Sequence, residues 1–591
     1  MTDFHFSPRP NRASKIAWRT WGDDAFREAR SADKPVLLAI SAVWCHWCHV
    51  MDETSYSDPA VIVGINERYI PIRVDNDERP DVNRRYNMGG WPTTAFLTPD
   101  GEILNGATYI PPDAMRRYVA EVADLWRDKR SELEPRLREL KAHEADAHAQ
   151  KPGDLDGSIV GAIGALIRGQ YDSEYGGFGR EPKFPQPKLL RFLIDEYRRT
   201  QSGDVAAMLH KTLAAMASGG MYDLIEGGFF RYSTTRAWGI PHFEKMLEDN
   251  AELLAIYSEA HRTFPSAGYD RIVRDVMRWM DTVLWRDDVK AFSGSQDADE
   301  HYYTLDTAGR AAHGAPFVDR RVYSGWNALA AAAYLVAANA LGEHGPHDRA
   351  VAVMRSLGSR MWDGTALAHF DRGDGPELRG LLADYGAAIG TILDEYETGE
   401  HPNALAAAAD MSGAMRRTLE DPAAGGFWDA PERDAPGRLA MREKPIEDGA
   451  AMADALLRLG VLTGDDQWRD SALRALRGFV GEYRQWGQFA AAFGSTVARA
   501  LGEPRLAVVV GPADDPVAKA LWQVVLASDD PNGARQWLVP GRDSERITAR
   551  GYPPDRVAAY VCVGTVCSAP IAAPADLAAE LARVRRRFEQ D

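Results

Sequence analysis

The sequence predicts a multidomain fold: an N-terminal α/β domain, an all-α (α/α)6 barrel and a small C-terminal α/β segment. Strand-like and helix-like segments alternate up to about residue 150. Only helical periodicity follows, to about residue 502, and the alternation then returns. We therefore place the domains at 1–150, 151–502 and 503–591.

Composition narrows the possible partners. The 591 residues carry a net charge of -17, with acidic and basic residues mixed along the chain, which argues against nucleic acid and anionic membranes. No apolar run approaches the ~20 residues of a membrane helix. The N-terminus, MTDFHFSPRPNRASKIAW, lacks the apolar core of a secretory signal. We expect a cytoplasmic protein, in which a close cysteine pair is more often redox-active or metal-binding than structural.

The first domain shows a regular order of segments. We predict strands at 35–41, 69–75, 95–98 and 102–107, and helices at 23–31, 59–68 and 112 to about 148, with a further helix beginning near His49. The run at 35–41 is almost continuously apolar, as in a strand that is covered on both faces of a sheet.

Cys45 and Cys48 form a C-x-x-C motif between the first strand and the following helix. A helix N-terminus offers free amide donors and a partial positive charge, and both stabilise a thiolate. We predict that Cys45 is the attacking thiol and that Cys48 resolves the mixed disulfide. A protonated His46 would stabilise the Cys45 thiolate further.

Pro92 enters the third strand, where a proline cannot donate to the sheet ladder. A strand, a C-x-x-C helix, a second strand and a proline-led hairpin together resemble the thioredoxin plan. That resemblance implies a cis Trp91–Pro92 bond facing the cysteines; an ordinary trans edge proline is the alternative.

Other interpretations of Cys45 and Cys48 stay open. Zinc binding would use His46 and His49 as extra donors, although a structural site needs four convergent ligands. The string C-H-W-C-H also matches the c-type haem attachment pattern, and an inert buried pair is the simplest alternative. We expect no metal and no cofactor.

The barrel prediction rests on about twelve helical segments. They begin near residues 155, 187, 203, 243, 268, 326, 346, 380, 402, 449, 465 and 490. Connections after the even-numbered helices are short, and the others are mostly long. Gly-Gly-Phe recurs in the long ones, ending at Phe178, Phe229 and Phe427, with Phe292, Phe370 and Phe489 as looser copies. A closed ring of six hairpins fits this pattern; an open solenoid would give the same period.

The C-terminal segment alternates again, with strands near 506–510 and 557–563 and helices near 516–527 and 574–588. Cys562 and Cys567 lie here, and they are the only cysteines outside the first pair. We interpret them as a second dithiol that exchanges with the first, or as two small apolar residues at a strand end.

Several long motifs resemble one family. They include DKPVLLAISAVWCHWCHVMDETSYSD, VDNDERPDVNRRY, GGWPTTAFLTPDG, YDSEYGGFGREPKFPQP, MYDLIEGGFFRYSTTRAWGIPHFEKMLEDNAEL, QDAD, GWNAL and LLADYG. The chain is similar over nearly its whole length to the thioredoxin-domain family of the spermatogenesis-associated protein 20 type. This resemblance implies a thioredoxin-like domain fused to a six-hairpin barrel of the glycosidase and sugar-epimerase superfamily.

Three barrel loops depart from the family pattern. They are Glu300-His301-Tyr302-Tyr303 after QDAD, Arg321-Val322-Tyr323 before Trp326, and Ala451-Met452-Ala453-Asp454 after Asp448-Gly449-Ala450. These departures put a sugar site taken over from the family in doubt and leave the thioredoxin site intact.

The long loops hold the candidate barrel site. A histidine beside carboxylates is able to remove a proton next to a sugar carbonyl, so we predict His242 and Glu244 as catalytic. The predicted substrate-binding residues are Trp91, Asp223, Arg231, Trp238, Asp297, Asp299, Trp326, Asn327, Asp384 and Asp448. For any one of these charged residues, an ion pair that locks two loops together is an equally good interpretation.

Three functions follow. The first is a thiol–disulfide redox domain coupled to a barrel that binds or modifies a carbohydrate-like small molecule, with protein thiols as further partners. The second is a sugar epimerase, isomerase or glycoside hydrolase whose thioredoxin domain is structural; hydrolysis would need two carboxylates flanking one bond. The third is a binding or chaperone-like module.

Overall fold

The computed structural model describes residues 4–147, 150, 152–528, 530 and 532–588, which form two compact units. Unit 1 contains Met1–Ala149, Ser295–Asp319 and Asp429–Glu443. Unit 2 contains Gln150–Gly294, Arg320–Trp428 and Lys444–Asp591. Two stretches of the barrel sequence thus belong to unit 1, and the C-terminal segment belongs to unit 2. The limits at 150 and 502 remain predictions.

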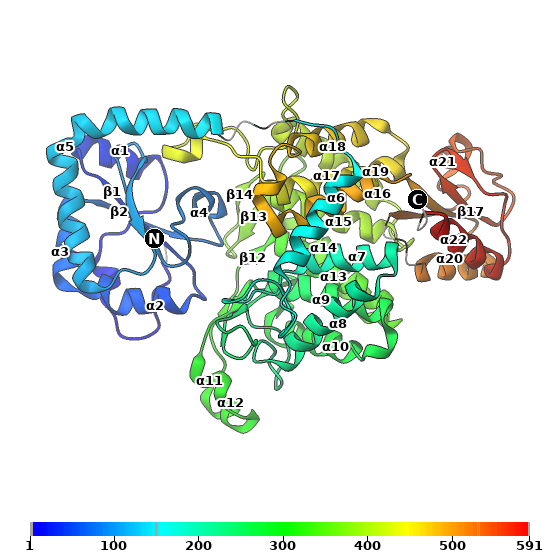
Figure 1. Cartoon of the computed structure of the whole chain (residues 1–591), viewed down its shortest axis with the longest axis horizontal. Coiled ribbons are helices and arrows are strands. Elements are labelled where there is room, and N and C mark those ends of the chain that lie inside the picture. The colour runs from blue at the N-terminus through cyan, green and yellow to red at the C-terminus, as the bar shows by residue number, and fades with distance from the viewer. Residues whose placement is uncertain (1–3, 148–149, 151, 529, 531, 589–591) are drawn as a thin grey trace. The chain divides into compact units, whose positions relative to one another are not determined.

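Unit 1 is built on a four-stranded sheet of order β2-β1-β3-β4 (Figure 1). The strands are β1 (Val36–Ser41), β2 (Ile70–Asp75), β3 (Thr93–Leu97) and β4 (Ile103–Ala107). β2 runs parallel to β1, whereas β3 and β4 are antiparallel to their neighbours. Each predicted strand of this domain is present, and its ends differ by no more than two residues.

Helices cover both faces of this sheet, as the apolar run of β1 predicts. Leu37 and Ala39 pack with α2, α3 and α5, while Val36, Leu38 and Ile40 point to the opposite face, toward α1 and α4. The helices are α1 (Asp23–Ala32), α2 (His46–Glu53), α3 (Pro59–Arg68), α4 (Pro80–Tyr86) and α5 (Pro112–Ala147), with short 3-10 turns at Ala13–Lys15 and Ser55–Ser57. The predicted end of α5 at residue 148 lies outside the described residues.

The two added segments of unit 1 pack on this domain. Ser295–Asp319 holds β10 (Ser295–Gln296), α11 (Glu300–Thr304), α12 (Thr307–His313) and β11 (Val318–Asp319). Asp429–Glu443 contributes Leu439 to the core beside α1 and α4. Its Asp429 also forms a buried ion pair with Arg85 at 2.8 Å.

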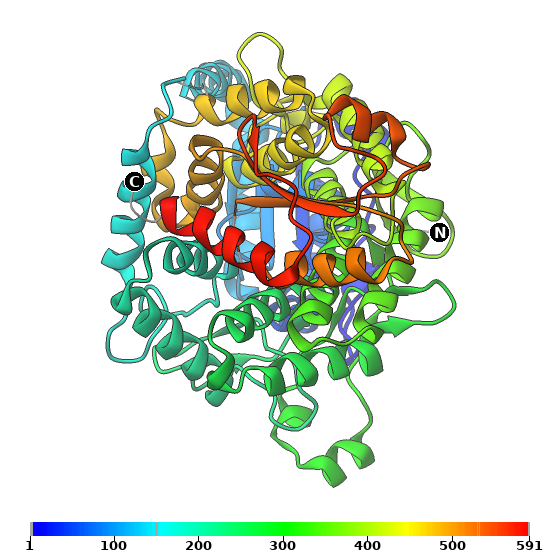
Figure 2. The same cartoon turned by 90° about the vertical axis from the view of Figure 1, so that its right-hand side faces the viewer.

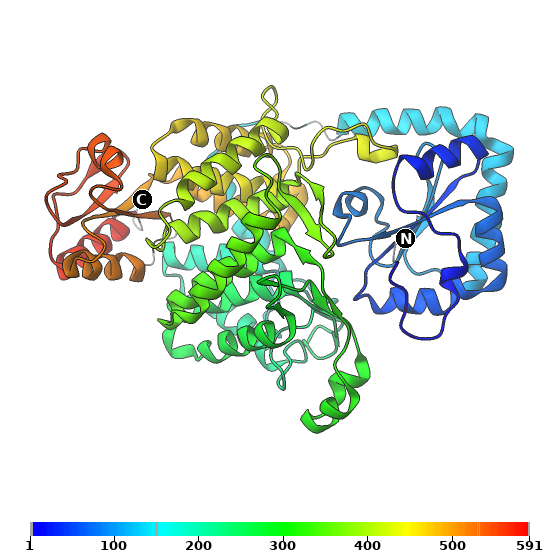
Figure 3. The same ribbon diagram turned by 180° about the vertical axis from the view of Figure 1, so that it is seen from behind.

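Unit 2 contains a closed ring of six helical hairpins (Figures 2 and 3). Its helices are α6 (Gly157–Gln170), α7 (Pro187–Thr200), α8 (Gly203–Ser218), α9 (Leu247–Thr263), α10 (Asp270–Trp279), α13 (Ser324–Leu341), α14 (Gly345–Arg360), α15 (Leu382–Tyr396), α16 (Ala404–Leu419), α17 (Ile446–Thr463), α18 (Asp466–Gly478) and α19 (Ala491–Leu501). The inner helices α7, α9, α13, α15, α17 and α19 follow one another, and α19 packs back on α7. This closure excludes the open solenoid.

The long connections carry short strands and turns. These are β5 (Tyr232–Ser233), β6 (Pro241–His242), β7 (Lys245–Met246), the π-helix Met280–Leu284, β8 (Trp285–Arg286), β9 (Ala291–Phe292), β12 (Val322–Tyr323), β13 (Ala368–Asp371) and β14 (Pro376–Arg379). There are 3-10 turns at Pro265–Ala267, Gly437–Ala440 and Tyr483–Ala490. The helix predicted near 243 begins at Leu247, because Pro241–His242 and Lys245–Met246 are extended.

The Gly-Gly-Phe repeat has a structural cause. Phe178, Phe229 and Phe427 each form a backbone bridge to the end of the preceding outer helix. In each of these loops a lysine binds an aspartate and a glycine carbonyl: Lys183 with Asp172 and Gly176, Lys245 with Asp223 and Gly227, and Lys444 with Asp421 and Gly425. Two of the looser copies were assigned wrongly. Leu367 takes the position predicted for Phe370, because it bridges Trp362, and Phe489 lies exposed in a 3-10 turn.

A second four-stranded sheet, of order β16-β15-β17-β18, ends unit 2. Its elements are β15 (Arg505–Val510), α20 (Pro516–Ala527), β16 (Gly533–Leu538), α21 (Ser544–Ala549), β17 (Ala558–Val563), β18 (Val566–Cys567) and α22 (Pro574–Phe588). It joins the short-connection end of the ring: Trp522 donates to the Thr398 carbonyl and Gln536 to the Tyr396 hydroxyl. No helix of the described part of the chain is long and apolar enough to cross a membrane.

Candidate functional site

The dithiol motif lies where β1 gives way to α2. Cys45 is the N-cap residue of α2, and its Sγ accepts a hydrogen bond from the Cys48 amide at 3.2 Å. A disulfide joins Cys45 to Cys48. Both cysteines are buried, at 4% and 2% exposed. The amide that caps the helix would equally stabilise a Cys45 thiolate after reduction.

Aromatic residues frame this motif. The Trp91–Pro92 bond is cis, as the thioredoxin plan implies. The Trp91 ring meets the Trp44 ring edge-on at 5.8 Å, and Trp91 Nε1 donates to Asn83. Trp44 Nε1 donates to the Asp77 carboxylate at 2.6 Å. These contacts hold the residue before Cys45 and the residue before Pro92.

Segment 295–319 supplies carboxylates to both histidines of the motif. His46 Nδ1 lies 3.6 Å from Glu300, and His49 Nε2 lies 3.9 Å from Asp297 and 3.1 Å from the Val43 carbonyl. We predicted Asp297 as a sugar ligand in a barrel loop; the structure places it in unit 1, beside the dithiol helix. Asp299 caps α11 by accepting the Tyr302 amide.

Burial lowers the pKa of His49 from 6.5 to about 4, and the nearby His5 lowers this pKa further, against an opposing effect of Asp52. His49 is therefore neutral at pH 7 and is able to accept or donate one hydrogen bond on each side of its ring.

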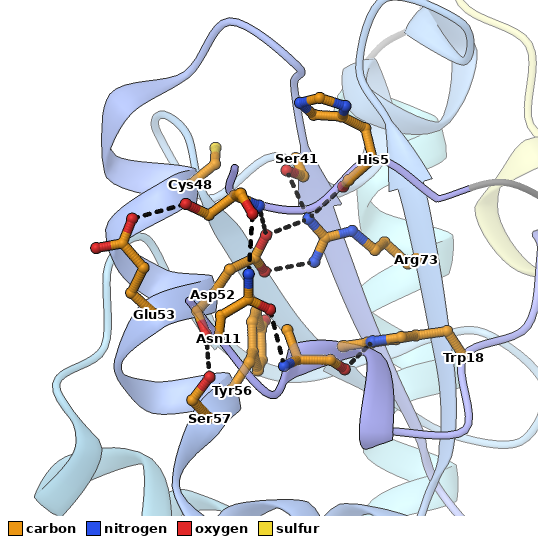
Figure 4. Close-up of polar contacts among 12 residues, drawn as sticks. His5, Asn11, Trp18, Ser41, Cys48, Asp52, Glu53, Tyr56, Ser57 and Arg73 are labelled. Atoms are coloured by element: carbon orange, nitrogen blue, oxygen red, sulfur yellow. Dashed lines mark hydrogen bonds and ion pairs between the residues drawn. The ribbon is translucent and has the colours of Figure 1, made fainter. Parts of the chain in front are cut away.

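A buried ion pair lies one helical turn after Cys48 (Figure 4). Asp52 on α2 accepts two hydrogen bonds from the guanidinium of Arg73 on β2, at 2.8 and 2.9 Å. Arg73 also donates to the Ser41 hydroxyl and the His5 carbonyl, and Asp52 accepts the Ser7 amide. The pair thus ties α2, the sheet and the N-terminal segment together. Sequence reasoning missed it, because its partners are far apart in the chain.

In unit 2, His242 and Glu244 come together as predicted partners. His242 Nδ1 lies 3.5 Å from Glu244 Oε1. Glu244 is 2% exposed, and its Oε2 has no hydrogen-bond partner among the described residues. The His242 ring stacks on Tyr232 at 4.6 Å, and Tyr232 stacks on the exposed Phe184 at 4.6 Å. Phe184 was not predicted as a site residue, although an aromatic residue close to a glycine-rich loop is a signal for such a residue.

Three predicted ligands have structural contacts. Asp223 pairs with Lys245 at 2.6 Å in the repeated loop element. Asn327 holds the Phe292 backbone from both sides, just as Asn250 holds Phe229. Asp384 accepts the Gly325 amide and lies 2.9 Å from His369 Nδ1. For these residues the loop-locking interpretation accounts for the observed contacts.

The other predicted residues lie in the long connections or in the first turns of the helices that follow them. Trp238 is buried and donates to the Tyr175 carbonyl. The Arg231 guanidinium lies 5.8 Å from the Tyr232 ring, close to His242. Trp326 is half-buried against Tyr323, and Asp448 lies in the first turn of α17.

Sequence reasoning also missed a lysine among the inner helices. Lys188 of α7 lies 3.2 Å from Glu252 of α9 and forms a short ion pair with Glu447 of α17. Burial lowers the pKa of Lys188, but these carboxylates outweigh it and raise the pKa well above its usual range. A buried His369–Asp384 pair is a second missed cluster. The members of the first cluster come from different hairpins, whereas His369 lies in the connection that leads to α15 and Asp384 in the first turn of α15.

Cys562 and Cys567 lie directly opposite each other on β17 and β18 and form the second disulfide. Cys562 is buried and Cys567 is exposed. The Tyr552 hydroxyl lies 3.4 Å from Cys562 Sγ and 3.8 Å from Cys567 Sγ. A disulfide thus joins these two strand-end residues, and exchange with Cys45 and Cys48 remains a prediction.

The architecture and the dithiol define the class: a thioredoxin-like domain joined to an (α/α)6 barrel. Residues 9–143 match the Thioredox_DsbH family, described as a protein of unknown function, DUF255. The chain is 27% identical to mouse spermatogenesis-associated protein 20 over 95% of its own length and 89% of that protein's. It is thus similar over nearly its whole length to spermatogenesis-associated protein 20, as its motifs indicate.

Other relatives match parts of the chain. An uncharacterised Caenorhabditis elegans protein, B0495.5, is 35% identical over 48% of this chain; the match spans 41% of that protein. Thiol:disulfide interchange protein DsbD 1 of Pseudomonas aeruginosa is 38% identical over 84 residues, 14% of each chain. A solved cellobiose 2-epimerase from Bacillus thermoamylovorans covers 56% of this chain, with 88% of its own length matched, at 11% identity and a TM-score of 0.45.

Proposed function

We propose that unit 1 catalyses thiol–disulfide exchange through Cys45 and Cys48. The observation that supports this most is the Cys45 Sγ at the N-cap of α2, where it accepts the Cys48 amide and is bonded to Cys48. The similarity to the interchange protein DsbD 1 adds support. The helix N-terminus favours the thiolate form of Cys45, which is the nucleophile.

In the reducing direction, the Cys45 thiolate attacks one sulfur of a substrate disulfide and forms a mixed disulfide. The first substrate sulfur leaves as a thiolate and takes up a proton. The deprotonated Cys48 then attacks Cys45 Sγ, releases the second substrate thiolate and restores the Cys45–Cys48 disulfide. Two electrons pass from the dithiol to the substrate, and the oxidising direction is the reverse.

The test is reduction of insulin and of hydroxyethyl disulfide by the dithiol form of the full chain, the small substrate being included because both cysteines are buried. We expect turnover that Cys45→Ser abolishes. Cys48→Ser should instead accumulate a mixed disulfide at Cys45, seen by mass spectrometry. If neither substrate is reduced by the wild-type chain, or Cys45→Ser retains the rate, the proposal is wrong.

We further propose that the long-connection end of the barrel binds a carbohydrate-like ligand at Glu244. A buried carboxylate oxygen without a partner costs free energy unless a ligand hydroxyl donates to it. Beside it, the stack of His242, Tyr232 and Phe184 offers an apolar face of the kind on which a sugar ring packs.

Thermal shift with a panel of mono- and disaccharides tests this binding. A binding sugar should raise the Tm by about 2 °C or more at saturation, and Glu244→Gln should reduce that shift. Glu343→Gln, an exposed glutamate on an outer face, is the matched control and should keep it. No shift with any sugar, or equal shifts in both variants, would count against the site.

Turnover separates the enzymatic alternatives. If His242 removes a proton next to a sugar carbonyl, deuterium from heavy water should appear in a bound sugar. Binding without deuterium uptake or hydrolysis would favour a binding module. Stable capture of client thiols at Cys45 without release would favour the chaperone-like alternative.

A further inference from the structure

Three histidines gather at the short-connection end of the barrel, the opposite end of the hairpins from the Glu244 site. His344 and His347 lie at the start of α14, and Glu400 and His401 lie in the connection between α15 and α16. Asp348 follows in the first turn of α14. Neighbouring hairpins of the ring supply the two halves of this cluster, so no sequence motif announces it.

His347 distinguishes this cluster from ordinary surface ion pairs. The residue is 7% exposed, and both ring nitrogens are buried without a hydrogen-bond partner among the described residues. A neutral imidazole has one donor and one acceptor, and leaving both unpaired in a buried position costs free energy. Neutral imidazole is the commonest metal ligand in proteins, so a metal ion is one partner that would satisfy the lone pair of His347.

The spacing of the donor atoms suits one ion. His347 Nε2 lies 3.7 Å from Glu400 Oε2, and donor atoms of His347, Glu400 and His401 all lie within 4.8 Å of one another. Two ligands at tetrahedral angles, each ~2 Å from a zinc ion, stand roughly 3.3 Å apart. Small side-chain rotations would close the difference.

An outer carboxylate lies beside the second nitrogen of His401. His401 Nδ1 lies 3.3 Å from Glu395 Oε1, which leaves the buried Nε2 of His401 without a partner. His347 Nδ1 lies farther from a carboxylate, 4.0 Å from Asp348, so only His401 has a carboxylate close to its second nitrogen. Metal-binding histidines usually present their second nitrogen to a carboxylate in this way.

We propose that His347, Glu400 and His401 bind a divalent transition metal of the zinc class. His344 Nε2, 3.6 Å from the same Glu400 oxygen, is placed on the exposed side to complete the coordination. Imidazole donors with one carboxylate suit zinc, cobalt or nickel, whereas calcium and magnesium prefer oxygen ligands alone. The sequence suggested no metal, so this site revises that expectation.

The ion would join two hairpins at a connection that packs on α20. Thr398, in the same connection as Glu400, accepts the Trp522 indole of α20 at 2.8 Å. Gly399 has a positive φ of 86°, and a Cβ there would meet Trp522 at 2.9 Å. The connection is therefore packed tightly against α20, and a metal at its other side would hold it to α14.

The test uses the full chain with both disulfides formed, so that no thiolate contributes ligands. After chelation and gel filtration, Zn²⁺ is titrated calorimetrically and Co²⁺ is titrated by visible absorption. We expect one Zn²⁺ per chain and a tetrahedral Co²⁺ spectrum. His347→Gln and His401→Gln should each weaken Zn²⁺ binding by about tenfold or more.

His210→Gln, a half-buried histidine of α8 outside the cluster, is the matched control and should bind as the wild type does. If the substitutions at His347 and His401 prevent folding, Glu400→Gln is the test variant, because the Glu400 side chain is exposed. Absence of binding by the wild-type chain, or binding that all the cluster variants retain, would overturn the proposal.

Discussion

The two disulfides of this chain differ in what surrounds them. Cys45 caps a helix, and the Cys48 amide already points at its sulfur. Cys562 and Cys567 face each other across a β-hairpin, with one tyrosine hydroxyl near both sulfurs. A helix N-terminus stabilises a thiolate, while a strand pair has only a small net dipole. Only the first environment is therefore built to stabilise an attacking thiolate.

The largest effect should come from Cys45→Ser. Without the nucleophile, reduction of hydroxyethyl disulfide should fall by about 10³-fold or more, measured by coupled turnover. Cys567→Ser, which removes the exposed sulfur of the other pair, should reduce the rate far less. An equal loss of rate in the two variants would contradict this difference and would mean that electrons pass through both cysteine pairs.

A second comparison is between a buried and an exposed ion pair of unit 1. Asp52 and Arg73, one helical turn after Cys48, are both buried. Asp52→Asn leaves the Arg73 charge without its partner, and we expect unit 1 to lose about 3–5 kcal/mol of unfolding free energy. Denaturant unfolding of unit 1, followed through the signal of its tryptophans, measures this loss of free energy. The exposed pair of Arg127 and Asp128 is the control, where Asp128→Asn should leave the free energy of unfolding almost unchanged.

Acid should weaken unit 1 through His49. Its pKa is about 4 when folded and 6.5 when unfolded, so the unfolded chain binds more protons between these values. Stability should therefore fall as the pH drops from about 6.5 to 4, by up to ~3 kcal/mol, and this contribution should level off below pH 4. His49→Gln should lack this part of the pH dependence; an unchanged profile in the variant would remove His49 as its source.

The smallest expected effect concerns His46. A protonated His46 stabilises the Cys45 thiolate and so makes the first pair more oxidising. His46→Ala should lower its reduction potential by about 30 mV, equivalent to a tenfold change in the exchange constant. Equilibration with glutathione and mass spectrometry report both pairs in one sample. The Cys562–Cys567 potential serves as the internal standard, and a first-pair potential that His46→Ala leaves unchanged would refute the role of His46.

Local patterns predicted much of the fold. The apolar run of β1, the proline at position 92 and the alternation of short and long connections each depend on neighbouring residues, and each prediction agrees with the structure. The ion pair of Asp223 with Lys245 was not predicted, although the two residues share one loop. The ring closure of α19 on α7 was inferred from the period alone, and packing established it.

The sequence by itself determined the dithiol, its place at a helix start and the count of hairpins, because these follow from spacing within one segment. Only the tertiary structure brought Asp297 to His49, Arg73 to Asp52 and His347 to His401. These partners come from distant segments, and burial together with the loss of water decides which of them pair. The charge and protonation states of this protein depend on such pairs. Its chemistry is therefore harder to predict from the sequence than its fold is.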